Sequence, residues 1–217
     1  MHLVSLQAGR PRTVGTPGAE NPMERAFTSA IWKDPVVGPV RAGALGLEGD
    51  RVANTRVHGG PDQALLMYAA AHYPLWRAEW GRPDLMAGAF GENLTVEGLT
   101  ETEGCIGDLL AIGSAVFQIS HPRQPCATLA RRHQVPNMIK LVQRNGRSGW
   151  YLRVLREGVV EAGQPIELRE RPHPEWPVRR AALAMLQRRE RPAEAAALAG
   201  CAALSAGWRE RLAAGPR

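Results

Sequence analysis

A short proline-rich segment, SHPRQPCATL at residues 120–129, sets Arg123 and Cys126 three positions apart. Pro122 and Pro125 restrict the backbone there and limit its rearrangement when a ligand binds. A nearby arginine stabilises a thiolate, which favours nucleophilic attack or the binding of a soft metal. A lone cysteine is also often a small buried side chain. The residues by themselves therefore leave three roles open for Cys126: nucleophile, metal ligand or core residue.

Two further segments place cationic side chains next to turn-forming residues. Lys33, in TSAIWKDPV, is one of only two lysines among 27 cationic residues, and a compact ammonium suits a phosphate contact. In RVHGGPDQAL, Arg56 and His58 precede Gly59 and Gly60, whose freedom to adopt positive φ lets backbone N–H groups approach an anion. The alternatives are a solvated surface lysine and a tight structural turn with an exposed histidine.

A third segment, GAFGENLTVEGL, predicts an irregular loop that leads into a strand. Asn93 in this loop has the donor and acceptor groups to bind a polar heterocycle. In isolation we favour a structural role, in which Asn93 caps backbone groups. The other two cysteines, Cys105 and Cys201, lie in apolar surroundings, and we expect both to be buried.

Composition indicates a globular protein of the reduced cytoplasm. The chain has 217 residues, 44% of them hydrophobic, and no apolar run approaches the ~20 residues that span a bilayer. Three widely spaced cysteines do not form a disulfide framework. Residues 169–217 carry ten Lys and Arg against five Asp and Glu, so five of the six net positive charges lie in the tail. That tail has no helix-turn-helix pattern, and we do not expect it to bind nucleic acid.

Element patterns predict a mainly β fold followed by helices. Short β-prone runs with glycine-bearing connections continue to about residue 170 and favour a β-barrel, with helices expected in AAAHYPLWRAEW and PNMIKLVQRNG. After the proline-rich RPHPEWP, the Ala- and Arg-rich tail predicts three helices, the first with Val178, Ala182, Met185 and Leu186 on one face. We therefore expect a domain at 1–170 and a three-helix domain at 171–217.

These motifs together resemble the MOSC domain family. The resemblance rests on SAIWKDPV, GLEGDRVANTRVHGGPDQAL, GAFGENLTVEGLTE, IGDLLAIGSAVFQISHPRQPC and GRSGWYLRVLREGVV, in this order. It is strongest to the YiiM-like branch, which joins a MOSC β-barrel to a C-terminal three-helix domain. The resemblance implies binding of the molybdenum cofactor, a pterin dithiolene that brings two sulfurs of its own, and no pyridoxal phosphate. Cys126 would supply the single protein thiolate, so one cysteine suffices.

The resemblance also implies an activity: two-electron reduction of N-hydroxylated compounds such as hydroxylaminopurines, hydroxylamines and amidoximes, which would detoxify them. His58 is the candidate proton donor, because imidazole titrates near neutrality. No flavin, nicotinamide or iron–sulfur motif is apparent, so we expect an external flavodoxin- or ferredoxin-like electron donor, docked near the basic tail, and a possible homodimer. A non-catalytic cofactor carrier or sulfur-transfer module that uses Cys126 is the alternative. The expected cofactor contacts are Lys33, Arg56, His58, Gly59, Gly60, Asn93, Arg123 and Cys126.

Overall fold

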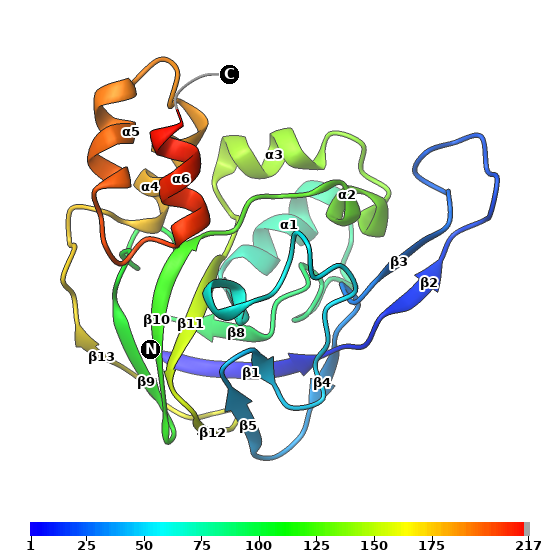
Figure 1. The fold of residues 1–217 in the computed structure, drawn as a ribbon. Helices are drawn as coiled ribbons and strands as arrows, with labels where there is room; N and C mark the ends of the chain where they lie inside the picture. The colour runs from blue at the N-terminus through cyan, green and yellow to red at the C-terminus, as the bar shows by residue number, and fades with distance from the viewer. Residues whose placement is uncertain (215–217) are drawn as a thin grey trace.

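The computed structural model describes residues 1–214, and its main element is an eight-stranded sheet (Figure 1). The strands are β1 (His2–Ala8), β4 (Asp34–Val36), β7 (Leu65–Ala69), β8 (Leu94–Glu97), β9 (Leu109–Ile112), β10 (Ala115–Pro122), β11 (Trp150–Arg156) and β13 (Ile166–Glu170). Their order is β13-β9-β10-β11-β7-β8-β1-β4, and within this sheet only β7 and β8 pair in parallel. A second sheet joins β12 (Gly158–Val160), β5 (Val40–Gly43) and β6 (Gly46–Leu47).

Backbone hydrogen bonds close the large sheet on itself. Leu3 N donates to Gln164 O at 3.0 Å, and Ile166 N donates to Met1 O at 2.9 Å, so β1 meets the start of β13. The result is a barrel whose interior is filled by apolar side chains from most of its strands. The predicted mainly β fold with a few helices is thus confirmed.

The central strand β7 shows why an uninterrupted apolar run forms a strand here. Leu65 and Met67 face the barrel core, whereas Tyr68 belongs to a second, aromatic cluster outside the barrel. Alternate side chains of a strand point to opposite faces, so a strand covered on both faces needs apolar residues throughout. The aromatic cluster holds three helices: α1 (His72–Trp80), α2 (Ala127–His133) and α3 (Met138–Asn145).

The sequence predicts two of these three helices. Helix α1 has Pro74 in its first turn, and α3 ends at Gly146, which has φ 73° and so takes the left-handed conformation that glycine tolerates. Helix α2 was not predicted. It has seven residues, too few for a helical repeat of apolar positions to be recognised, and it starts directly after Cys126.

The predicted tail helices are α4 (Val178–Leu186), α5 (Pro192–Ala199) and α6 (Ala206–Ala213). The predicted apolar face of α4 was partly wrong, because Leu186 is 48% exposed while Ala181 and Ala184 are buried. Small alanine side chains let α4 approach the barrel closely, and the tail helices contribute to the same apolar cluster as the barrel strands. The division into domains at 1–170 and 171–217 stays a prediction.

An arm projects from the barrel (Figure 1). It consists of the paired strands β2 (Arg12–Val14) and β3 (Phe27–Ser29) with the loop between them. Two side chains of the α2 region hold it: the Arg131 guanidinium lies 3.9 Å from the Phe27 ring centre, and Gln134 Nε2 donates to Met23 O at 3.1 Å. The arm is thereby fixed next to the segment that carries Cys126.

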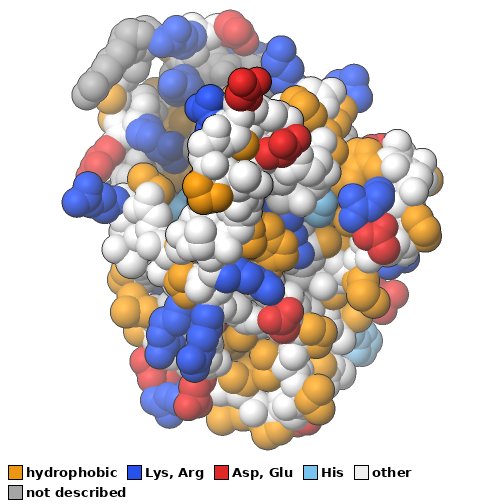
Figure 2. All heavy atoms as spheres, turned by 90° about the vertical axis from the view of Figure 1, so that its right-hand side faces the viewer, with side chains coloured by type: hydrophobic (Ala, Val, Ile, Leu, Met, Phe, Trp, Pro, Cys, Tyr) orange, Lys and Arg blue, Asp and Glu red, His pale blue; other side chains and the backbone are white. Residues whose placement is uncertain are grey.

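On the face shown in Figure 2, Lys and Arg side chains are scattered among acidic and hydrophobic ones. In the tail, Arg179 donates to the carbonyls of Gln143 and Arg144, and Arg180 pairs with Glu194 at 2.9 Å. Much of the tail's positive charge is therefore engaged within the molecule. No helix within residues 1–214 has both the length and the apolar character to cross a membrane.

Candidate functional site

A cavity of about 400 Å³ lies between the arm, the start of α2 and the loop that follows β6. Six of the eight expected cofactor contacts line it: Lys33, His58, Gly59, Asn93, Arg123 and Cys126. Arg56 and Gly60 do not. They line a neighbouring cavity of about 940 Å³, which shares His58, Gly59 and Cys126 with the first. The structure therefore brings most of the predicted residues together and places the other two at the neighbouring cavity.

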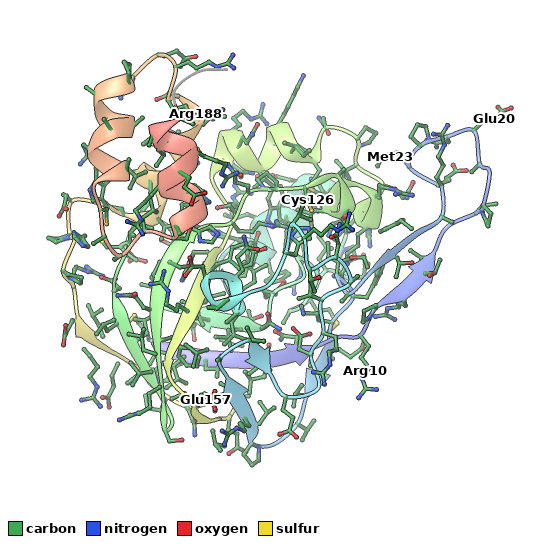
Figure 3. All side chains as sticks on the ribbon, in the orientation of Figure 1. Arg10, Glu20, Met23, Cys126, Glu157 and Arg188 are labelled. Carbon is green, nitrogen blue, oxygen red and sulfur yellow. The ribbon has the colours of Figure 1, made fainter. Side chains whose placement is uncertain are left out.

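Cys126 lies where the loop from β10 meets α2, and Figure 3 labels it at the start of that helix. Its side chain is partly exposed, whereas Cys105 and Cys201 are buried as predicted. The backbone holds this loop: Arg123 N donates to Gly149 O at 3.0 Å, and Leu129 N donates to Cys126 O at 3.1 Å. Of the cysteines within residues 1–214, Cys126 is the one that lines this cavity and its neighbour.

Three buried polar atoms on the wall of the 400 Å³ cavity have no hydrogen-bond partner within the described residues. They are Arg123 Nη1, Arg131 Nε and Gln63 Oε1. The Arg123 residue is only 5% exposed, and its side chain also contacts the Tyr151 hydroxyl. A buried polar group without a partner costs about 1–3 kcal/mol. A ligand with anionic and hydrogen-bonding groups would satisfy these atoms.

Asp50 joins two of the predicted contacts into a network. Its Oδ1 accepts from Lys33 Nζ at 2.5 Å and from Gly9 N at 2.7 Å, and its Oδ2 accepts from Asn93 Nδ2 at 2.8 Å. Asn93 also accepts from Leu66 N through Oδ1, at 3.1 Å. Burial lowers the pKa of Lys33, and the Asp50 carboxylate opposes that shift.

This network changes what Lys33 and Asn93 can do. The Lys33 charge is already neutralised by a carboxylate, and the Asn93 amide is used by the backbone and by Asp50. Both residues therefore shape the cavity wall, and Lys33 retains hydrogen-bond donors beyond the one it gives to Asp50. Sequence reasoning missed Asp50, because one aspartate in GLEGDR gives no local signal of a partner 17 residues away.

The glycine turn has the geometry expected from the sequence. Gly59 and Gly60 have φ of 77° and 83°, and a side chain at Gly59 would meet Val52 Cγ2 at 3.1 Å. The turn holds His58 at the mouth of the cavity, where burial and the Arg123 charge lower the pKa of the imidazole.

The functional groups at the cavity are those that the molybdenum cofactor would need. One thiol, that of Cys126, faces the cavity, as a metal with sulfurs of its own requires. Two arginine side chains with unpartnered nitrogen atoms suit an anionic group, and Gln63 adds an acceptor for a polar heterocycle. Arg131 and Gln63 were not among the predicted contacts, because their approach to Cys126 depends on helix α2 and on the 3₁₀ turn at Pro61–Gln63.

Comparisons with known proteins agree with this geometry. The MOSC domain family model matches residues 54–167. YflK of Bacillus subtilis is 43% identical over 169 residues, which cover 78% of this chain and 73% of that protein. A Gibberella moniliformis protein named Reductase is 41% identical over 179 residues, or 81% of this chain but only 30% of that protein. The crystal structure of YiiM from Geobacillus stearothermophilus superposes with a TM-score of 0.81 at 37% identity, covering 98% of this chain and 97% of that one.

Proposed function

Because the chain belongs to the MOSC domain family, we propose that it is a molybdenum cofactor-dependent reductase of N-hydroxylated compounds. One observation carries the proposal: the Cys126 thiol faces a cavity whose wall holds buried arginine atoms without partners. The name of the Gibberella relative supports a reductase, although this chain matches less than a third of that protein. The YiiM-like fold over nearly the whole chain supports the same branch of the family.

The net reaction converts R–NHOH, two electrons and two protons into R–NH₂ and water. When bound, the cofactor supplies a metal centre that takes up and passes on the two electrons. In this proposal Cys126 Sγ holds the metal, and Arg123 and Arg131 bind the anionic part of the cofactor. An imidazole nitrogen of His58 supplies a proton to the leaving oxygen. The electrons come from an external flavodoxin- or ferredoxin-like donor.

Replacing the ligand tests the proposal. The Cys126→Ser variant, produced in cells that make the cofactor, is expected to lose bound molybdenum and N-hydroxy reductase activity together. Cys201→Ala is the matched control, because it also removes a thiol but lies buried in the helical tail. Molybdenum is measured by elemental analysis and activity with a reducing dye as donor. Retention of metal and activity in Cys126→Ser would contradict the assignment, and a persulfide on Cys126 without molybdenum would favour the carrier alternative.

A further inference from the structure

The larger cavity next to Cys126 has a wall that belongs to the C-terminal helices. It measures about 940 Å³, and helix α6 lines it with residues that include Trp208, Glu210 and Arg211. The opposite wall is the turn at residues 56–63. Of the two cavities that Cys126 lines, Arg123 and Arg131 line the smaller one and not the larger. With the cofactor against those arginines, the larger cavity is the remaining approach to Cys126.

Helix α6 is fixed to this approach by polar contacts at its first turn. The Asp62 carboxylate accepts from Ala206 N at 3.2 Å through Oδ2 and from Arg153 Nε at 2.7 Å through Oδ1. Ser205 N donates to Ser120 O, at 3.1 Å, so the helix start is also tied to β10. Asp62 thus links the glycine turn, the barrel and α6, which sets the width of the cavity between them.

Ring packing behind the polar contacts stiffens the same wall. The buried His121 ring lies 5.1 Å from the Tyr151 ring and 5.5 Å from the Trp208 ring, measured between ring centres. Tyr151 lines both cavities. Close-packed rings resist displacement, because any gap loses dispersion contacts. The wall formed by α6 is therefore a rigid part of the surroundings of Cys126.

One flexible contact crosses from α6 to the loop that carries Cys126. Arg211 Nη1 donates to Gln124 Oε1 at 2.8 Å, two residues before Cys126. The same guanidinium donates from Nε to Gly207 O at 3.3 Å and lies 5.6 Å from the Trp208 ring centre. Both Arg211 and Gln124 are exposed, so this contact can open at small cost, unlike the ring contacts of the buried His121.

We propose that the larger cavity is the substrate approach to Cys126 and that the Arg211–Gln124 contact limits the size of the molecules that pass. Small hydroxylamines pass with the contact closed, and bulky N-hydroxylated heteroaromatic compounds need it open. Arg211 is thus a specificity-determining residue supplied by the C-terminal helices. The substrate class rests on the proposed function, but passage to the thiol is a property of the chain without cofactor.

The test uses alkylation of Cys126 in cofactor-free protein, with two uncharged reagents of different size. Iodoacetamide is small, and N-pyrenylmaleimide is bulky and flat. In Arg211→Ala the pyrenyl reagent is expected to react about fivefold faster than in wild type, and iodoacetamide at an unchanged rate. A factor of about five corresponds to the loss of one exposed charge-assisted hydrogen bond. Gln124→Ala removes the same contact from the loop side and is expected to behave alike.

Arg209→Ala is the matched control, since it removes the same charge from the same helix but lines neither cavity. Its alkylation rates are expected to equal those of wild type. Mass spectrometry assigns the modified cysteine, and thermal unfolding shows that each variant is folded. Equal pyrenyl rates in wild type, Arg211→Ala and Gln124→Ala would overturn the proposal, because the Arg211–Gln124 contact would then not limit which molecules reach Cys126.

Activity of the cofactor-loaded enzyme separates the two proposals. Arg211→Ala is expected to raise kcat/KM for a bulky heteroaromatic hydroxylamine relative to hydroxylamine itself, again by about fivefold. An unchanged ratio in an active enzyme would overturn the role of Arg211 alone. A molybdenum-loaded wild type without activity on either substrate would overturn the proposed function, and the alkylation rates would still show whether the Arg211–Gln124 contact limits access to Cys126.

Discussion

Removing the Asp50 carboxylate is expected to destabilise the protein far more than removing an exposed acidic partner. The Lys33 and Asp50 side chains are 9% and 8% exposed, and their charged atoms are 2.5 Å apart. Asp50→Asn keeps an oxygen that can accept from Gly9 N but leaves the buried Lys33 ammonium without its paired carboxylate. Breaking a buried pair in this way costs about 3–5 kcal/mol, and we expect about 3 kcal/mol, because the side chain at position 50 still offers an acceptor to Gly9 N.

The assay is urea unfolding of wild type and variants at pH 7. Asp34→Asn is the control, since the Arg12–Asp34 pair is 3.8 Å long with side chains 46% and 80% exposed, and its loss should cost under about 0.5 kcal/mol. Adding Lys33→Met to Asp50→Asn removes the orphaned charge. The double variant is therefore expected to recover most of the lost stability.

The pH dependence gives a second check on the same reasoning. Burial lowers the pKa of Lys33 in the folded protein, and Asp50→Asn removes the carboxylate that opposes this shift. Between the lowered folded pKa and the unfolded value of about 10.4, the unfolded chain binds more protons, so stability rises with pH. The deficit of Asp50→Asn should shrink from pH 7 to pH 10. A deficit no larger than that of Asp34→Asn, or a double variant that does not recover, would refute the argument.

Two histidines give further predictions. Burial lowers the pKa of His121 to about 3 in the folded protein. In the unfolded chain its pKa is about 6.5, so between pH ~6.5 and ~3 only the unfolded chain binds a proton at this imidazole. The free energy of unfolding therefore falls by about 1.4 kcal/mol for each pH unit of acidification in that range. His121→Phe keeps a ring between Tyr151 and Trp208 and should make the free energy of unfolding in urea less sensitive to pH from 7 to 5. The same pH dependence in wild type and variant would show that protonation of His121 does not contribute to it. If His58 donates a proton, kcat should fall as pH rises through its lowered pKa, and a cofactor-loaded His58→Gln enzyme should lose that dependence. The same pH profile in both enzymes would remove His58 from the reaction.

The barrel strands and the glycine turn were predictable because their signals are local. Strand β10 begins with alternating buried and partly buried side chains, and it is joined to β9 by a turn at Gly113, whose φ is 54°. Gly59 and Gly60 adopt the positive φ that their sequence indicates. In both cases a few neighbouring residues decide the backbone conformation.

The parts that escaped prediction depend on contacts between distant segments. Asp50 meets Lys33 and Asn93 only after β1, β4 and β8 have paired, and nothing in their short sequences specifies that approach. Arg56 was expected with the other cofactor contacts because it lies two residues from His58. The turn instead directs it to the larger cavity. A loop's sequence indicates that it bends but does not fix which side chains point to which side.

The C-terminal helices are packed and hydrogen-bonded to the rest of the chain, and this fixes their position relative to Cys126. The first turn of α4 donates to barrel carbonyls, Val178 N to Gly104 O at 2.8 Å and Arg179 N to Glu101 O at 2.7 Å, so its free N–H groups are satisfied by the barrel. Its buried side chains join the same apolar cluster as the strands. The change of composition near residue 170 therefore does not divide the hydrophobic core. Helix α6 joins this cluster through Trp208 and Leu212, and Ser205 N at its start donates to Ser120 O of β10, so the wall it places against the loop of Cys126 is attached to the barrel, as a wall that selects molecules by size requires.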